Sequence, residues 1–208
     1  MKKILTIFGT RPELIKLSRL IKLLDNDPDI DHVVCNTGQH TDLLAGLFTL
    51  FDVKPKYDLN IMKESQTLAG LTSRLMISLD DIIKKENPDL VIVHGDTSSC
   101  FVGALAAFYN KIAIAHVEAG LRTGDILEPF PEEANRIMVD SISSLLFAPT
   151  YKSALNLTQE NICPEKIKLT GNTAIDSLLY TKGILKHCDI KLKHKLQDDK
   201  RLILVTAH

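Results

Sequence analysis

The feature that most constrains this chain is the alternation of short apolar runs with longer amphipathic stretches. Runs rich in β-branched residues predict strands at 3–8, 31–36, 89–94, 111–116, 144–148, 166–169 and 201–206. Helical patterns lie between them at 12–25, 41–51, 66–86, 97–109, 131–143, 150–160 and 173–186. Several strands are continuously apolar, which indicates that helices cover both faces of the sheet. The sequence therefore predicts an α/β fold built on a doubly wound, Rossmann-like parallel sheet.

Composition and charge exclude several classes of function. With 208 residues, 45% of them hydrophobic, the chain is long enough for one sizeable core. Its net charge of −1 provides no field that would attract nucleic acid or an anionic membrane, and no apolar stretch is long enough to span a bilayer. The four cysteines form no C-x-x-C pair, which predicts reduced thiols in a cytoplasmic protein; they are Cys35, Cys100, Cys163 and Cys188.

The chain is predicted to divide near its C-terminal end. Residues 1–186 carry the repeated strand–helix pattern and form the main domain. Segment 183–200 is basic and polar, typical of a linker or of a helix with a solvated face. The apolar run that follows predicts a new strand, so we expect residues 187–208 to be a linker and the first strand of an incomplete second domain.

Polar motifs follow five of the predicted strands, at 9–13, 37–40, 94–97, 117–122 and 170–173. Parallel sheets of this kind bind ligands outside the carboxyl ends of their strands. The five loops are therefore predicted to form one site. Neither G-x-G-x-x-G nor G-x-x-x-x-G-K-[ST] occurs in the sequence, which argues against a nicotinamide cofactor, and we expect no cofactor.

Two strand ends carry residues that could form a mixed metal site. His94 with Asp96, and His116 with Glu118, are spaced two residues apart, which places both members of a pair on one face of a strand. Gly95 interrupts the first pair, and histidines at strand ends also satisfy local hydrogen bonds. We therefore predict no metal.

Acidic and basic residues at the same edge suggest proton transfer beside a phosphate. Asp96, Glu118 and Glu132 lie on three separate connections, and carboxylates gathered in a cleft repel one another, which favours general acid–base chemistry near neutral pH. Positive charge around them suits phosphate oxygens and comes from Arg11, Lys16, Arg122 and Arg136.

Each of these residues also has a simpler interpretation. Glu132 follows Pro131 in the first turn of a helix, where acids favour the helix dipole, and Thr97 is a typical N-cap. Asp96 and Glu118 could pair with Arg11 and Arg122. The functional interpretation depends on the shared location of the group.

Seven motifs, in order along the chain, resemble the UDP-N-acetylglucosamine 2-epimerase family of the non-hydrolysing bacterial type: FGTRPELIKLSRL, TGQH, VHGDTSS, HVEAGLRTGD, PFPEEANR, TGNTAIDSL and LILVTAH. The resemblance implies the N-terminal half of a two-domain glycosyltransferase-B-like fold. It implies interconversion of UDP-N-acetylglucosamine and UDP-N-acetylmannosamine, for surface polysaccharide precursors, without metal or cofactor. In the family's reaction the C2 proton is removed and UDP expelled to give 2-acetamidoglucal, and UDP then adds back.

The resemblance also implies roles for individual residues. The catalytic group would be Asp96, Glu118, Glu132 and His208. The residues that bind substrate would be Arg11, Lys16, Gln39, His40, Arg122, Asn135 and Arg136. Arg74 matches a residue of the family's regulatory site, whereas residues 41–46 depart from the pattern of that site.

Family members are much longer than this chain, so we expect it to lack the second, UDP-binding half and to show weak or no turnover without that half. Three alternatives stay open: an epimerase of a modified UDP-sugar of the diacetamido uronic acid type, half of a glycosyltransferase, or an inactive half that needs a partner. The expected partners are a UDP-sugar and either a second copy in a homodimer or a separate C-terminal half.

Overall fold

The structure, a computed structural model, describes residues 1–39, 45–63, 65–186, 201, 203 and 205. Its centre is a parallel sheet of seven strands in the order β3-β2-β1-β4-β5-β6-β7. The strands are β1 (Lys2–Phe8), β2 (Ile30–Asn36), β3 (Tyr57–Asp58), β4 (Leu90–His94), β5 (Ala113–Val117), β6 (Leu145–Ala148) and β7 (Ile167–Leu169). The predicted α/β fold with a doubly wound parallel sheet is confirmed.

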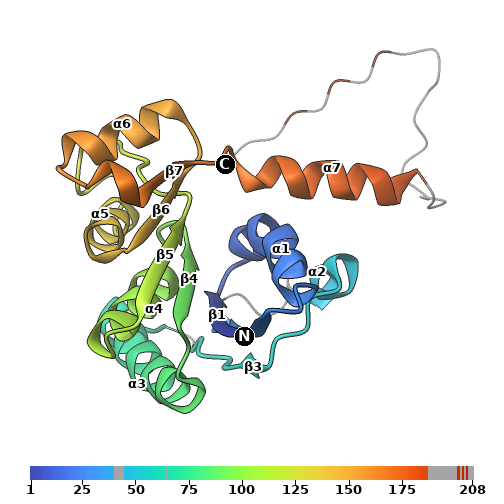
Figure 1. Ribbon diagram of the computed structural model, residues 1–208, viewed down its shortest axis with the longest axis horizontal. Helices are drawn as coiled ribbons and strands as arrows, with labels where there is room; N and C mark the ends of the chain where they lie inside the picture. The colour runs from blue at the N-terminus through green and yellow to red at the C-terminus, as the bar shows by residue number, and fades with distance from the viewer. Residues whose placement is uncertain (40–44, 64, 187–200, 202, 204, 206–208) are drawn as a thin grey trace.

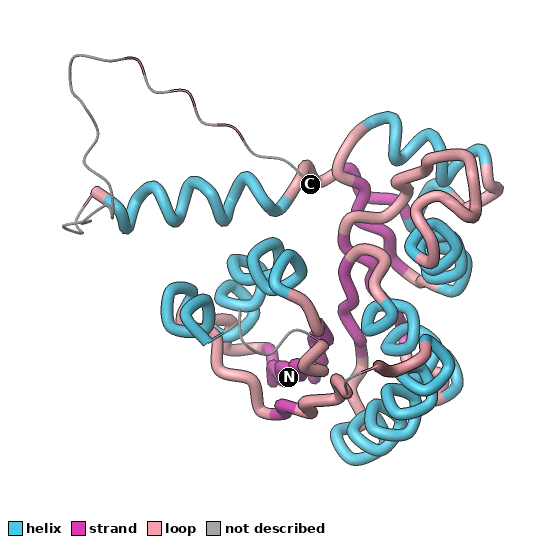
Figure 2. The backbone as a smooth tube through the Cα atoms, turned by 180° about the vertical axis from the view of Figure 1, so that it is seen from behind, coloured by secondary structure: helices cyan, strands magenta, loops and turns pink. Residues whose placement is uncertain are grey.

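Helices cover both faces of the sheet. They are α1 (Arg11–Asp25), α2 (Ala45–Phe51), α3 (Leu68–Glu86), α4 (Ser98–Tyr109), α5 (Glu132–Ile142), α6 (Tyr151–Gln159), α7 (Thr173–Leu185) and the short 3-10 helix η1 (Pro164–Lys166). Figures 1 and 2 show α1, α2 and α7 on one face and α3 to α6 on the other. None of the described helices has an apolar stretch long enough to cross a membrane.

The order of the strands reverses beside β1, and this reversal positions the site. β1 pairs with β2 on one side, where Leu5 lies opposite Val33, and with β4 on the other, where Leu5 lies opposite Val91. The chain leaves β1 through α1 on one face and leaves β4 through α4 on the opposite face. The two connections therefore diverge at the carboxyl ends of β1 and β4, where doubly wound sheets bind their ligands.

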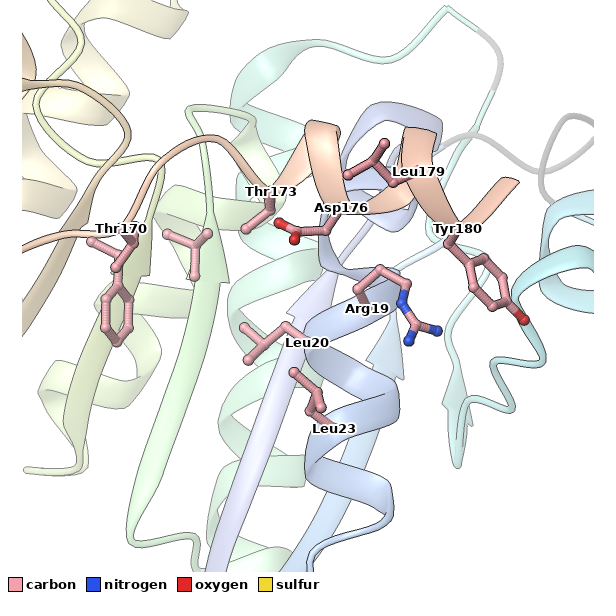
Figure 3. A pocket seen from close by; sticks show the side chains of 10 residues that line it. Arg19, Leu20, Leu23, Thr170, Thr173, Asp176, Leu179 and Tyr180 are labelled. Carbon is pink, nitrogen blue, oxygen red and sulfur yellow. The ribbon is translucent and has the colours of Figure 1, made fainter. Parts of the chain in front are cut away.

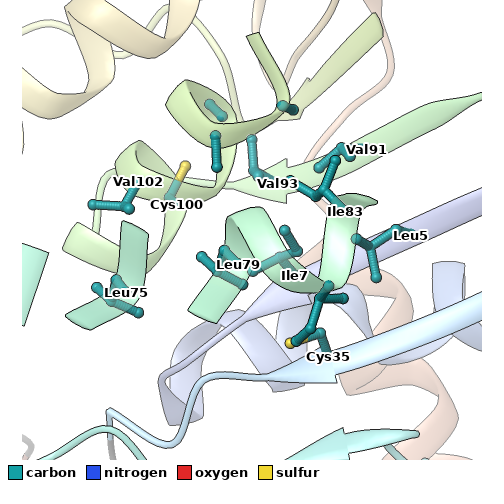
Figure 4. Close-up of a cluster of buried hydrophobic side chains, with 14 of the residues drawn as sticks. Leu5, Ile7, Cys35, Leu75, Leu79, Ile83, Val91, Val93, Cys100 and Val102 are labelled. Atoms are coloured by element: carbon teal, nitrogen blue, oxygen red, sulfur yellow. The ribbon is translucent and has the colours of Figure 1, made fainter. Parts of the chain in front are cut away.

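The core forms because strand side chains alternate between the two faces. Leu5 and Ile7 of β1 pack with the buried leucines of α3, in the cluster shown in Figure 4. Ile4 and Phe8, one residue out of step, pack against α1 and α2 on the other face. Each fully buried leucine, such as Leu75 on α3, contributes about 1.5–3 kcal/mol.

Most predicted elements are present. The six predicted strands from 3–8 to 166–169 are confirmed, but the two-residue β3 was missed because it is too short to show a pattern. Of the predicted strand 201–206, only Arg201, Ile203 and Val205 are described; none is in a strand, and Ile203 is 82% exposed. Residues 187–200 lie outside the described residues, so the predicted linker and the domain boundary at 186 stay predictions.

Candidate functional site

Asp96 is held in place by helix α5 at the end of β4. Gly95 turns the chain with a φ of +69°, and the hydroxyl of Thr97 then caps α4. The side-chain amide of Asn135 donates to the carbonyl of Asp96 at 2.8 Å, and the guanidinium of Arg136 forms an ion pair with its carboxylate. The predicted N-cap is confirmed. Asp96 is thus paired, but with Arg136 and not with Arg11.

Glu118 follows β5 in a conformation that L-residues rarely adopt, with a φ of +69°. In a regular strand it would face away from α1, because Val117 packs on the α1 side. The left-handed turn instead brings its carboxylate to Lys16 of α1, whose ammonium donates to both carboxylate oxygens at 2.6 and 2.7 Å. Bonds from the Gly95 and Ala119 amides to the ends of β5 and β6 fix the turn. Such strain costs about 1–3 kcal/mol and is typical of functional sites.

A buried ion-pair network supports both loops. His116 contacts Asp140 through Nδ1 at 2.6 Å and the carbonyl of Gly95 through Nε2 at 2.7 Å. A carbonyl and a carboxylate only accept, so both ring nitrogens are placed to donate. Asp140 also accepts from the amide of Gly120 and pairs with Arg122 at 2.8 Å. Burial would raise the pKa of Asp140, but His116 and Arg122 more than offset this and hold the pKa below its usual range.

This network bears on the metal alternative. With both nitrogens of His116 donating, no lone pair remains for a cation. Gly95, with its positive φ, separates His94 from Asp96 as the sequence suggested. Within the part of the chain that the structure describes, no three His, Cys, Asp or Glu side chains are grouped so that they could hold a metal ion.

Glu13 is a site residue that the sequence analysis missed. Its carboxylate, which is 2% exposed, accepts from the amides of Gly9 and Thr10 at 3.0 and 2.7 Å and from the hydroxyl of Thr97 at 2.8 Å. Burial raises its pKa above the usual value. Dinucleotide folds use the amides of this loop for a pyrophosphate. Here the chain's own carboxylate occupies them, and the Thr-x-x-Glu capping spacing would have revealed it.

The carboxyl edge also contains a cavity of about 270 Å³ between the loops. Its lining comes from the ends of β1, β2 and β4 and the starts of α3 and α5: Thr10, Pro12, Gln39, Leu68, Thr97, Ser98, Pro131 and Glu132. Gln39 is oriented by the hydroxyl of Ser99, which donates to its side-chain oxygen at 2.9 Å. Glu132, in the first turn of α5, is thus brought to the same edge as Asp96 and Glu118.

Other predicted residues lie elsewhere. Arg122 donates to both oxygens of Glu160 at 2.6 Å and lines a different cavity beside α6, so its contacts favour a structural role over substrate binding. Arg74 pairs with Gln66 and lines a separate hollow with Lys63. Arg11 is exposed at the start of α1.

Two predicted residues are not described by the structure, and one predicted loop lies at a different cavity. His40 and His208 lie outside the described residues. Thr170 and Thr173, from the loop after β7, line a larger cavity of about 480 Å³ between α1 and α7 (Figure 3). That cavity is mostly apolar, and its arginine, Arg19, stacks over the Tyr180 ring at 4.2 Å from its centre. Of the three candidate acids, Glu132 lines the smaller cavity, and Asp96 directly precedes Thr97 of its lining.

Comparison with known proteins places the chain in a family. The family model described as UDP-N-acetylglucosamine 2-epimerase matches residues 22–208. The chain belongs to the UDP-N-acetylglucosamine 2-epimerase family. It is 47% identical to the UDP-N-acetylglucosamine 2-epimerase of Campylobacter jejuni and 48% identical to that of Bacillus subtilis, over 100% and 99% of its own length. It covers 57% and 53% of theirs, so the chain spans about half the length of the curated relatives it matches.

Solved epimerase structures show the same architecture. A UDP-GlcNAc 2-epimerase from Neisseria meningitidis bound to UDP-GlcNAc superimposes with a TM-score of 0.86 at 47% identity, covering 88% of this chain and 50% of that one. The Methanocaldococcus jannaschii UDP-GlcNAc 2-epimerase in complex with UDP-GlcNAc and UDP gives 0.84 at 42% identity, covering 90% and 51%. MurG of Acinetobacter baumannii, at 15% identity and a TM-score of 0.54, shares the fold alone. The expected half of a glycosyltransferase-B-like fold is confirmed.

Proposed function

We propose that this chain supplies the proton-transfer half of a UDP-N-acetylglucosamine 2-epimerase. The observation that carries the proposal is Glu118, held after β5 in a left-handed turn against Lys16, with Asp96 held on the neighbouring loop by Arg136. Glycine adopts a positive φ without strain, as Gly95 does. A glutamate kept in this conformation therefore indicates that its carboxylate is needed at this position. Relatives that bind UDP-GlcNAc support the choice of ligand.

The proposed reaction needs one group to remove a proton and others to release a diphosphate. A carboxylate takes the C2 proton of the sugar, the C1–O bond breaks, its electron pair leaves with UDP, and a C1=C2 double bond forms. Re-addition of UDP at C1 and proton delivery to the opposite face of C2 give the manno epimer. Asp96, Glu118 and Glu132 are our candidates for the proton carriers, because they surround one edge.

Cations at the same edge suit the diphosphate. Lys16 and Arg136 each lie against a carboxylate of the candidate group, at part-buried positions where a phosphate could compete for them. Because the chain spans about half of its relatives, we propose that the remaining half closes the site and grips the nucleotide. Exclusion of water and correct positioning account for many powers of ten in rate.

The test is proton NMR in D₂O with UDP-GlcNAc. The chain is mixed with the segment of the Bacillus subtilis relative that it does not cover, and loss of the sugar H2 signal is followed. We expect exchange at C2, and a loss of about 100-fold or more in Glu118→Gln and Asp96→Asn. Glu165→Gln, at an exposed site on η1, serves as the matched control. Exchange that survives Glu118→Gln would remove Glu118 from the proposed chemistry.

A further inference from the structure

His94, the last residue of β4, is buried without a hydrogen-bond partner. Its side chain is 3% exposed, and neither ring nitrogen has a partner among the described residues. Buried polar groups are nearly always hydrogen-bonded, because leaving one unsatisfied costs about 1–3 kcal/mol. A histidine in this position therefore needs an explanation that the resting structure does not supply.

The surroundings of His94 keep it neutral. Burial, together with the positive charges of Lys16 and His116, lowers its pKa to about 3. Lys16 faces it from α1, while His116 and Glu118 come from β5 and the turn after it; Cys100 of α4 contacts the neighbouring Gly95 carbonyl. At working pH, His94 can therefore donate a single hydrogen bond while carrying no charge.

The nearest acceptor to His94 is the carboxylate of Glu118. Its Oε2 lies 3.8 Å from Nε2 of His94, too far for a hydrogen bond, because Lys16 holds both carboxylate oxygens. A diphosphate, with more negative charge than one carboxylate, would draw the Lys16 ammonium away. Glu118, whose side chain is only 11% exposed, would then be an unpaired buried charge. A movement of about 1 Å toward His94 would satisfy both groups.

We propose that His94 is a positioning residue. When an anionic group of the ligand draws Lys16 away, His94 donates a hydrogen bond to the carboxylate of Glu118 in place of Lys16. The inference rests on the proposed function for the identity of that anion. Because of this exchange of partners, Glu118 becomes a stronger base only when substrate is present. A carboxylate held by a neutral N–H is more basic than one held by an ammonium, so Glu118 gains proton affinity as the diphosphate binds.

The exchange of partners can be tested without any substrate. Lys16→Met removes the ammonium, and the pKa of His94 is followed by NMR of its imidazole, assigned with a His94→Gln spectrum. We expect the pKa of His94 to rise by about 2 pH units, because a repelling charge is lost and a carboxylate becomes its partner. Lys22→Met, on the same helix and paired with Asp52 at 2.9 Å, removes an equal charge elsewhere and should leave His94 unchanged.

A double variant separates the two contributions. In Lys16→Met/Glu118→Gln the partner carboxylate is gone, so most of the rise should disappear. An unchanged His94 in Lys16→Met, or a full rise that persists in the double variant, overturns the proposal. If Lys16→Met does not fold, Lys16→Gln replaces it. The titration is independent of turnover: loss of C2 exchange with an intact His94 shift counts against the proposed epimerase chemistry and leaves the role of His94 standing.

Discussion

At the residue scale, the site is organised by a few buried charges that each have more than one partner. Asp140 accepts from His116 and the Gly120 amide and pairs with Arg122, and through them it fixes the loops after β4 and β5. His116 contacts the carbonyl of Gly95, one residue before Asp96, and so links Asp140 to the loop after β4. A change at Asp140 should therefore affect the loops of Asp96 and Glu118 together.

Asp140→Asn tests this network. Asn cannot carry the charge that compensates His116 and Arg122, so we expect a loss of about 3–5 kcal/mol in the free energy of unfolding at pH 7. Urea denaturation measures it, with Asp81→Asn, at an exposed position of α3, as the control. A cost no greater than that of the control would mean that the pairs contribute no net stability.

Sequence reasoning predicted which side chains meet at the carboxyl edge of the sheet but not which partners they have there. Asp96, Glu118, Glu132 and Asn135 follow from motif and position, because the carboxyl ends of parallel strands share one edge. Which cation meets which carboxylate depends on packing between α1, α5 and the sheet. The cations that pair with Asp96 and Glu118 are therefore Arg136 and Lys16, where Arg11 and Arg122 were the alternatives from sequence. The buried role of Glu13 was missed.

At the element scale, the strand-to-helix connections are short and tightly packed against their neighbours. The loop after β5 passes close to α6: a Cβ on Gly120 would lie 2.3 Å from the carbonyl oxygen of Ser153, and the φ of Gly120 is +82°. Gly124, four residues on, has a φ of +91° but open space around it. Comparing the two glycines therefore separates the cost of a positive φ from the cost of a steric clash with α6.

Gly120→Ala should be more costly than Gly124→Ala. Both substitutions strain a left-handed backbone, by about 1–2 kcal/mol, but only the first also forces α6 away, which adds about 1–3 kcal/mol. Thermal or urea unfolding of the two variants measures the difference. Equal losses would show that α6 can shift freely.

Glu86, the last residue of α3, contacts side chains from β1, from β3 and from the residue before β3. These contacts predict that the stability of the fold depends on pH. Burial would raise its pKa, but hydrogen bonds from Lys56, Tyr57 and Lys3 outweigh this and lower the pKa to about 2. A carboxyl with a depressed pKa in the folded state stabilises fully above its unfolded value of 4.5, and this stability is lost as pH falls toward 2.

The contribution of Glu86 is expected to be about 1–3 kcal/mol, because its lysine partners are partly solvated. Urea midpoints measured from pH 7 to pH 3 should fall less steeply in Glu86→Gln than in the wild type. Parallel curves for the two proteins would contradict the assignment.

At the scale of the whole molecule, one sheet with helices on both faces should unfold as one unit. Cys35 of β2 and Cys100 of α4 are fully buried in the same cluster, and burial, with a smaller effect of Asp58, raises the pKa of Cys35 to about 12. Cys163 is exposed between α6 and η1. All three are free thiols, as predicted from the sequence, and Cys188 lies outside the described residues.

Thiol reactivity tests this cooperativity. In a Cys188→Ser background, we expect Cys163 to react at once with a thiol reagent, and Cys35 and Cys100 to react together at the rate of global unfolding. Cys163→Ser should remove the fast phase alone. Separate slow phases for the two buried thiols would show that the halves of the sheet open independently.

The central claim is that the ligand binds at the carboxyl edge of β1, β4 and β5 and not in the larger cavity under α7. Titration of the ¹⁵N-labelled chain with UDP-GlcNAc, in the presence of the unlabelled segment of the Bacillus subtilis relative that the chain does not cover, tests it most directly when followed by amide chemical shifts. We predict shifts concentrated at residues 9–16, 95–98, 117–120 and 132–136. Shifts confined to Leu20, Leu23 and Leu179, or no shifts at millimolar ligand, would contradict the account.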